Sequence, residues 1–285
     1  MKRIFALLLA VLMVVSLASL AGCQKEEAAA KTAKVINIDL TEEQYAFGVD
    51  KDQPELLTEV NKFIAQIKED GTLKAICDKY YAGGKPEPVT SAKLDETKDQ
   101  LVVATNAAFE PFEYMQGDKF VGIDMEIAKL LADYLGKELV INNMDFDAVC
   151  LSVGQHKCDI AMAGLTINEE RKESVNFSDP YYEASQRVVV MSNNTMFDKC
   201  KTAADVEKIL NGLDSKTKIG YQNGTTGQFY VNGDEGWGFA GFKAKGVGYK
   251  NGSLAVQDMI NGNINLVIID KDPAEFITKA INAVA

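Results

Sequence analysis

Apolar strands and amphipathic helices alternate through residues 98 to 285, and this alternation limits the available folds more than any other feature. The segments that read as strands are "LVVATN" (101–106), "ELVINN" (138–143), "CDIAMAG" (158–164) and "RVVVMS" (187–192). Between them, residues 125–135 and 146–153 carry apolar residues at helical spacing. The alternation predicts a mostly parallel sheet covered by helices, and 285 residues are enough for two such cores.

A faint internal repeat also favours two cores. Residues 146–164 and 254–270 each give an amphipathic helix, a glycine-containing turn and an apolar strand. We therefore expect an α/β protein of two similar lobes, each with a mixed, mostly parallel sheet.

The first 23 residues have the features of an export signal. Lys2 and Arg3 precede an apolar run, Ile4 to Ala21, that is long enough to span a bilayer, and small residues lead into Cys23. The pattern resembles a bacterial lipoprotein signal, which implies cleavage before Cys23 and acyl chains on its thiol. An uncleaved anchor helix is the alternative. Both place the rest of the chain outside the cytoplasm, tethered to the bacterial cell membrane.

Composition bears on partners and metals. Without Lys2 and Arg3, 28 basic residues face 41 acidic ones, and a net charge of −13 argues against nucleic acid as a partner. There is one histidine, His156, and no cysteine pair has metal-ligand spacing, so we expect no metal and no cofactor. Free thiols are favoured over disulfides, because most of the cysteines after Cys23 replace apolar residues in periodic segments. These cysteines are Cys77, Cys150, Cys158 and Cys200.

Two polar stretches divide the chain. Residues 24–34 are polar and alanine-rich, as in a tether, and residues 83–99 contain glycine, proline and charges but almost nothing to bury, as in a linker. Between them, "YAFGVDKD" reads as a strand, a helix follows over Leu56 to Ile67, and a shorter helix spans Leu73 to Tyr81.

From residue 98 on, the chain resembles the extracellular solute-binding proteins of amino-acid ABC importers, family 3. The matching motifs are "LVVATNAAFEPFEY", "FVGIDMEIAKLLADYLG", "CDIAMAGLTINEERKESVNFSDPYY", "NGTTGQFY" and "LVIIDKDPAEF". The resemblance implies a two-lobed, periplasmic-binding-protein-like fold of type II. It covers almost all of residues 98–285.

The order of segments departs from that family. Its closing piece, a strand and helices of the first lobe, stands here at residues 40–84, ahead of the rest. We therefore predict a circular permutation. The alternative is a fusion of one protein's tail with a truncated second protein, in which the two halves do not pack together. The resemblance implies two hinge strands between the lobes. We expect one to be continuous near Arg187 to Ser192 and the other to be cut between Ala285 and residues 34–40, so that the lobes open more widely.

These observations predict the following division of the chain. Residues 1–23 form the signal peptide and its cysteine, and residues 24–34 the tether. Lobe 1 spans residues 35–190, with the permuted segment at 35–82 and the linker at 83–99, and lobe 2 spans residues 191–285.

A free amino acid brings a carboxylate and an ammonium, and each needs a partner in the cleft between the lobes. The resemblance assigns the carboxylate to Arg171, because guanidinium pairs with carboxylate through two parallel hydrogen bonds. Thr225 and Thr226, in "NGTTGQFY" before a helix, would add N–H and hydroxyl donors. The alternatives are a solvated arginine in the charge run "EERKE" and a plain helix cap at the threonines.

The ammonium needs acceptors. Asp270, at the end of the apolar strand "INLVIID", matches the family's acidic partner and lies where ligand crevices form in parallel sheets. The Gly164 carbonyl, next to Ala163, and the Thr166 hydroxyl would complete this set. Asp270 could instead cap the following segment.

The ligand's side chain is expected against Phe109, with Asn106, Phe146 and Gln222 nearby, whereas Phe112 is expected in the core. The neutral amides at 106 and 222 favour an uncharged polar or modestly apolar amino acid. Glu110 and Asp145 leave a cationic ligand open.

The resemblance implies a monomeric binding protein without catalysis, which closes over one amino acid and docks on an ABC-type permease powered by a separate ATPase. Two other classes stay open. One is an enzyme of the same fold that dehydrates prephenate or arogenate, although Glu173 and His156 have no visible partners in the sequence. The other is a ligand-sensing receptor domain.

Overall fold

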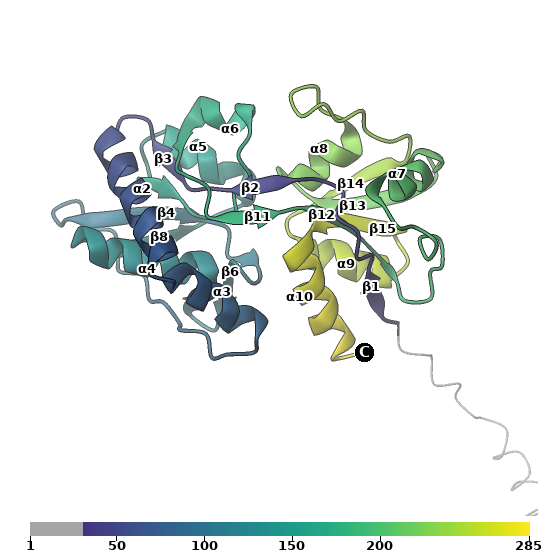
Figure 1. Cartoon of the computed structure of the whole chain (residues 1–285), viewed down its shortest axis with the longest axis horizontal. Coiled ribbons are helices and arrows are strands. Elements are labelled where there is room, and N and C mark those ends of the chain that lie inside the picture. The colour runs from purple at the N-terminus through teal and green to yellow at the C-terminus, as the bar shows by residue number, and fades with distance from the viewer. Residues whose placement is uncertain (1–30) are drawn as a thin grey trace, which may run out of the picture. The chain divides into compact units, whose positions relative to one another are not determined.

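Two five-stranded sheets form the centre of the computed structural model, which describes residues 31–285 (Figure 1). The predicted signal, Cys23 and residues 24–30 of the predicted tether lie outside the described residues. The sequence predicts a tether up to residue 34, whereas strand β1 already begins at Ala33. No described helix is long and apolar enough to cross a membrane.

The sheet of lobe 1 combines strands from both sides of the linker, in the order β10-β3-β9-β4-β8. The strands are β3 (Gly48–Asp50), β4 (Gln100–Thr105), β8 (Glu138–Asn143), β9 (Ile160–Ala161) and β10 (Val175–Phe177). β4 pairs in parallel with β8 and β9, and β3 pairs antiparallel with β9 and β10. Because β3 precedes the linker and lies inside this sheet, the two parts of the chain pack together, which contradicts a fusion whose halves do not pack.

Helices cover this sheet where the apolar spacing predicts them. α2 starts at Pro54, whose fixed φ suits the first helical turn, and Gly71, at φ 81°, turns the chain from α2 into α3. The helices are α2 (Pro54–Glu69), α3 (Thr72–Tyr81), α4 (Ile123–Leu135), α5 (Val149–Gly154) after the short turn η1 (Phe146–Ala148), and α6 (Glu169–Ser174). A small sheet adds β5 (Ala108–Phe109), β6 (Glu113–Gln116) and β7 (Lys119–Val121). Phe112 is fully buried, as predicted.

The sheet of lobe 2 has the order β1-β12-β15-β13-β14. Its strands are β1 (Ala33–Val35), β12 (Gln186–Met191), β13 (Lys218–Gln222), β14 (Lys245–Tyr249) and β15 (Leu266–Asp270). Its helices are α7 (Ala203–Asn211), α8 (Thr226–Asn232), α9 (Gly252–Ile260) and α10 (Lys271–Asn282). All five residues of β15 are buried, because the strand lies in the middle of the sheet with helices packed against it.

Two strands cross between the lobes, and neither lies where the sequence places it. β2 (Glu43–Tyr45) pairs antiparallel with β11 (Tyr182–Ala184), and Figure 1 shows this two-stranded ribbon running from one lobe to the other. The predicted crossings fail because β12 and β1 pair with each other inside lobe 2. Residues 35 and 186–190, predicted in lobe 1, therefore belong to the sheet of lobe 2.

The position of the ribbon also overturns the predicted cut hinge. Both crossings are continuous chain, because the chain passes from β1 through β2 into lobe 1 without a break. The C-terminal helix α10 and β1 lie side by side in lobe 2 (Figure 1). Wider opening through loss of a covalent crossing is therefore not expected.

The linker at residues 83–99 is docked on lobe 1 rather than free. Val89 is buried and exchanges two backbone hydrogen bonds with Phe120, at 2.7 and 3.0 Å. Further on, the Ala92 N–H donates to the Leu139 carbonyl. The sequence did not reveal this anchoring, because one valine among polar residues gives no periodic signal.

Candidate functional site

The predicted ligand-binding residues meet beside the crossing ribbon, at the carboxyl ends of parallel strands. Asn106 follows β4, Gln222 ends β13 and Asp270 ends β15. The two lobes are in contact here, since the Gln222 Nε2 donates to the Asn106 Oδ1 across 3.1 Å. Asn106 in turn donates to the Met144 carbonyl at 2.7 Å, and Gln222 is fully buried.

Arg171 also bridges the lobes. Its guanidinium donates to the Thr166 carbonyl of lobe 1 at 2.6 Å and to the Gly224 carbonyl of lobe 2 at 3.0 Å. It lies 5.1 Å from the ring centre of Phe146, a cation–π contact. The alternative of a solvated arginine in a charge run is therefore wrong. Two N–H groups are used, and a guanidinium offers five.

Phe109, the aromatic residue expected against the ligand's side chain, is tightly packed. Phe109 is 4% exposed and lies against Gly164, where an added Cβ would come within 3.0 Å of the ring. Gly164 also has φ 53°, so a side chain at this position is disfavoured both by the ring and by the backbone. Its N–H donates to Asp124 at 2.9 Å, and the preceding residue, Ala163, is fully buried.

The two threonines of "NGTTGQFY" have different roles. Thr225 is at the N-cap position of α8, but its hydroxyl donates to the Gln222 carbonyl at 2.8 Å and makes no capping bond. The hydroxyl of Thr226 instead points to the ribbon and donates to Glu43 at 2.7 Å. Both hydroxyl protons are thus used within the protein.

Asp270 is buried at 4% exposure and faces the ribbon. It occupies the N-cap position of α10 without any capping side-chain bond, which contradicts the capping alternative. Tyr45 donates to its Oδ1 at 2.6 Å. Burial and the nearby Glu43 charge raise the pKa of Asp270 to about 7, against hydrogen bonds from Tyr45 and Gln186 that lower it.

Sequence reasoning missed several buried polar residues here. They are Glu43 and Tyr45 on β2, Gln186 on β12, Glu113 on β6 and Asp124 on α4. Both oxygens of Glu113 are buried without a hydrogen-bond partner in the described part of the chain, and burial raises its pKa well above the ordinary value. Burial also raises the pKa of Asp124 to about 7.

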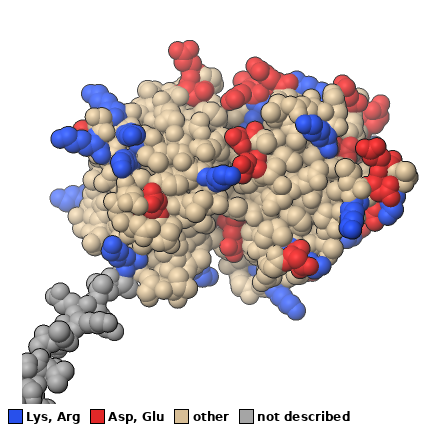
Figure 2. Space-filling view, turned by 180° about the vertical axis from the view of Figure 1, so that it is seen from behind, with Lys and Arg blue, Asp and Glu red and all other residues tan. Residues whose placement is uncertain are grey.

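The acids proposed for a cationic side chain take other positions. Glu110 is half-buried, and burial raises its pKa. Asp145 is exposed and pairs with Lys250 at 3.2 Å. On the face drawn in Figure 2, basic side chains are more numerous on the left half and acidic side chains on the right half.

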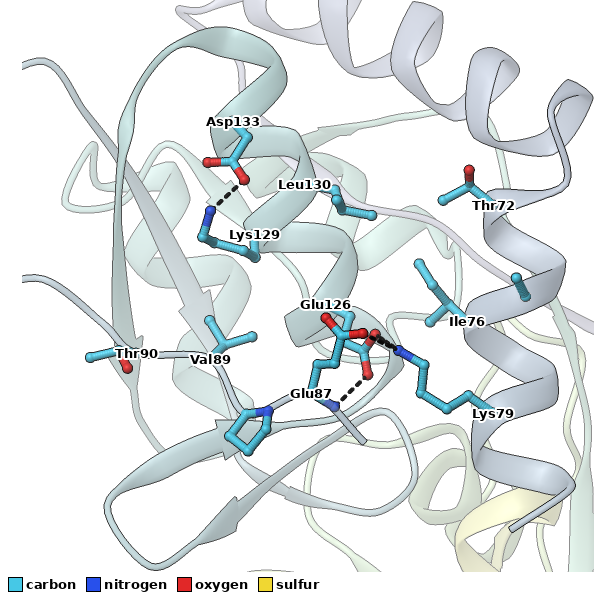
Figure 3. Close-up of a pocket in the computed structure, with 12 residues that line it drawn as sticks. Thr72, Ile76, Lys79, Glu87, Val89, Thr90, Glu126, Lys129, Leu130 and Asp133 are labelled. Atoms are coloured by element: carbon cyan, nitrogen blue, oxygen red, sulfur yellow. Dashed lines mark hydrogen bonds and ion pairs between the residues drawn. The ribbon is translucent and has the colours of Figure 1, made fainter. Parts of the chain in front are cut away.

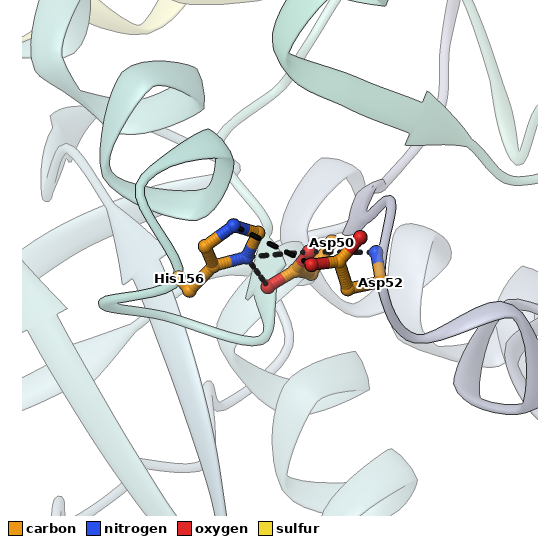
Figure 4. A group of neighbouring side chains, drawn as sticks. All are labelled: Asp50, Asp52 and His156. Carbon is orange, nitrogen blue, oxygen red and sulfur yellow. Dashed lines mark hydrogen bonds and ion pairs between the residues drawn. The ribbon is translucent and has the colours of Figure 1, made fainter.

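His156 does have partners, contrary to the prediction (Figure 4). Its Nδ1 lies 2.8 Å from buried Asp50, and its Nε2 lies 3.6 Å from exposed Asp52. One ligand atom from each residue falls within 4.8 Å of the others, so these three side chains could hold a metal ion. The four described cysteines are free thiols, of which only Cys158 is fully buried.

A separate cavity of about 640 Å³ lies in lobe 1 between α3, α4 and the docked linker (Figure 3). Its charged side chains are matched within the wall: Lys79 pairs with Glu126 and Glu87, and Lys129 pairs with Asp133. Glu126 also accepts hydrogen bonds from Tyr80 and from the Glu87 N–H. With these charges matched, the site beside the ribbon is the stronger candidate.

Comparisons with known proteins identify the family of the chain. The family model described as bacterial extracellular solute-binding proteins, family 3, matches residues 11–83 and 101–281. The chain is 40% identical over 92 residues to the arginine-binding extracellular protein ArtP of Bacillus subtilis, covering 32% of this chain and 36% of that protein. The matches to the first relatives cover 36%, 58% and 63% of their lengths, so the chain spans less than two thirds of each.

Solved structures of amino acid-binding proteins also resemble the chain. An ancestral arginine-binding protein bound to arginine matches with a TM-score of 0.55 and 34% identity, over 64% of this chain and 75% of that one. An ancestral amino acid-binding protein, a precursor of cyclohexadienyl dehydratase, matches with a TM-score of 0.55 and 30% identity, over 64% of this chain and 74% of that one.

Proposed function

The chain belongs to family 3 of the bacterial extracellular solute-binding proteins, and we propose that it binds one free amino acid between its lobes and delivers it to an ABC-type permease. A separate ATPase would supply the energy of transport. The chain would act as a monomer, held outside the cytoplasm by acyl chains on Cys23.

The observation that carries this proposal is the division of charged and polar groups between the lobes. Lobe 1 supplies Arg171 for a carboxylate, and lobe 2 supplies Asp270 for an ammonium. Their neighbours Asn106 and Gln222 already touch across the cleft. Because neither lobe alone can neutralise both charges of an amino acid, the ligand is fully bound only when the lobes are closed.

The amide pair favours a ligand side chain that donates hydrogen bonds. The Gln222 Oε1 is buried and has no partner in the described part of the chain. Leaving a buried acceptor unpaired costs about 1–3 kcal/mol, so a donor from the ligand is favoured here. Arginine and glutamine supply such a donor, whereas glutamate and methionine do not. The arginine-binding names of the relatives agree with this choice.

Binding without turnover is part of the proposal. One structural neighbour is a precursor of a dehydratase, so the fold alone does not decide between binding and catalysis. Arg171 is held in one position by two carbonyls and a ring, an arrangement suited to binding a ligand carboxylate. A bound amino acid should be recovered unchanged after denaturation of the complex.

We also propose that the order of segments is permuted. The two ends that would be joined in the family's order, the end of α10 and the start of β1, both lie in lobe 2. The family model matches in two blocks on either side of residues 84–100. The Asn282 side chain accepts from the Ala33 N–H at 2.9 Å and donates to the Ala33 carbonyl at 2.8 Å, so the two ends of the fold are adjacent. Only a short connection would be needed to link α10 directly to β1.

A thermal-shift screen of the twenty amino acids tests the ligand class. We expect L-arginine or L-glutamine to raise the Tm most, and L-glutamate and L-methionine, which lack the donor, to raise it less. The Gln222→Leu variant should lose this preference. Equal shifts for glutamine and methionine in the wild type would contradict the proposed side-chain class.

A further inference from the structure

Glu43 lies at the centre of the candidate site, although it belongs to the crossing ribbon. It is 4% exposed, and its two carboxylate oxygens accept four hydrogen bonds. Oε2 accepts from the hydroxyls of Thr166 in lobe 1 and Thr226 in lobe 2, each at 2.7 Å. Oε1 accepts from the Thr41 hydroxyl at 2.6 Å and from the Gln186 Nε2 at 3.0 Å.

These bonds determine what the two hydroxyls can offer a ligand. A threonine hydroxyl has one proton to donate and two lone pairs that accept. Thr166 and Thr226 both give that proton to Glu43, so each oxygen presents only lone pairs to a further neighbour. Among residues 31–285, no hydrogen bond is donated to either oxygen.

Further acceptors lie around the same point. Asp270 is close enough to Glu43 for the two charges to interact, and the Gln186 Oε1 is buried without a partner in the described residues. An ammonium group has three donors and no acceptor, so it matches this set. A ligand carboxylate at the same point would meet oxygen lone pairs and the Glu43 charge.

We propose that Glu43 is a positioning residue that fixes the Thr166 and Thr226 hydroxyls as acceptors and so reserves this part of the site for the ligand's α-ammonium group. The inference rests on the proposed function. It also changes the expected role of Thr226, whose hydroxyl proton is no longer available to the ligand carboxylate. The carboxylate is then left to Arg171 and to backbone N–H groups.

The test compares amino acids with analogues that lack only the amino group. The probes are L-arginine with 5-guanidinopentanoate, and L-glutamine with 5-amino-5-oxopentanoate. The Glu43→Gln variant replaces one acceptor oxygen by an NH₂ donor, which turns at least one threonine hydroxyl toward the ligand as a donor. We expect the affinity for the amino acid to fall by about tenfold or more, and the affinity for the des-amino analogue to stay unchanged or rise.

The selectivity ratio is the affinity for the amino acid divided by the affinity for its des-amino analogue. This ratio separates a positioning role of Glu43 from a purely structural one. Equal loss of affinity for amino acid and analogue would mean that Glu43 only holds the lobes together, and would overturn the inference. Glu42→Gln, a substitution at the exposed neighbouring position, is the matched control and should leave both affinities unchanged. If Glu43→Gln does not fold, Thr226→Val removes one of the two hydroxyls with little change of shape and should also reduce the ratio.

Failure of the proposed function gives a different result. A folded wild-type protein that binds neither amino acid contradicts the binding function and this inference together. A wild type that binds an amino acid, with an unchanged ratio in the Glu43→Gln variant, contradicts the inference alone.

Discussion

Tyr45 of the crossing ribbon donates a 2.6 Å hydrogen bond to Asp270 at the end of β15 in lobe 2. The ribbon therefore contacts the group that is proposed to hold the ligand's ammonium. Asp270 and Glu43 are both buried beside this contact, which places two acidic side chains close together in the candidate site.

Binding of an amino acid at Asp270 is expected to release a proton. Burial and the Glu43 charge raise the pKa of Asp270 to about 7. A bound ammonium favours the ionised carboxylate and lowers that pKa, so binding near pH 6.5 should release up to about one proton. Affinity should accordingly fall as the pH decreases below 7. Calorimetry in phosphate and in Tris, which differ in ionisation enthalpy, measures the proton count.

The Asp270→Asn variant should release no proton and bind more weakly. Asp214→Asn, a substitution of an exposed aspartate, is the matched control and should behave like the wild type. Identical heats in both buffers for the wild type would contradict this assignment.

Arg171 should be sensitive even to replacement by lysine. Its guanidinium spans the carbonyls of Thr166 and Gly224, and a single ammonium cannot reproduce both bonds together with the planar contact to Phe146. We expect Arg171→Lys to weaken amino-acid binding by about tenfold or more, with the fold intact by circular dichroism. Lys172→Ala, at the next position, should bind normally. An unaffected Arg171→Lys variant would remove Arg171 from the site.

The Asn282 side chain should stabilise the fold at the joint between α10 and β1. It makes two hydrogen bonds to the backbone of Ala33, and each contributes about 1 kcal/mol. Asn282→Ala is expected to lower the free energy of unfolding in urea by about 1–2 kcal/mol. Val284→Ala, at a position that is 87% exposed, is the control and should have little effect. Equal stability of the two variants would show that these two hydrogen bonds do not stabilise the joint.

A relinked chain tests the permutation. Residues 98–285 would be followed by a short glycine–serine linker and residues 33–84, which restores the segment order of the family. Because the ends to be joined are adjacent, we expect this protein to fold and to bind the same amino acid within about threefold of the original affinity. A relinked chain that stays unfolded would argue against the permuted order.

His156 should make stability depend on pH. Its hydrogen bond to Asp50 and the Asp50 charge raise the pKa of the imidazole. This stabilisation is present at pH values below the ordinary histidine pKa and is lost as the pH rises through the raised pKa. Urea unfolding of the His156→Gln variant should therefore show a larger destabilisation at pH 5.5 than at pH 8.5. Lys157→Gln serves as the control, and a difference independent of pH would refute the assignment.

The sequence predicts the site well where a polar residue follows an apolar strand. Asn106 directly follows β4 in lobe 1, whereas Gln222 and Asp270 end β13 and β15, which pair in parallel in lobe 2. Glu43 escaped prediction because two adjacent glutamates read as a charge run. On a strand, alternation turns Glu43 and Tyr45 inward and Glu42 and Gln44 outward, but one short strand does not fix which set is buried.

The crossing strands were misplaced for a related reason. β12 is a strong apolar run, and its local pattern is the same whichever sheet it joins. Its place in lobe 2 is set by pairing with β1 and β15, contacts between residues more than 70 positions apart. The true crossing segments are only three residues each and carry mostly polar side chains, so periodicity gives no signal for them.

The most direct test of the binding function is a calorimetric titration of L-arginine and of L-glutamine into the purified protein at pH 7.5, followed by analysis of the ligand released from the denatured complex. We predict saturable heat with one ligand per chain for at least one of the two, and recovery of that amino acid unchanged. A folded protein that gives no heat with either, or that returns a chemically altered ligand, would contradict this prediction.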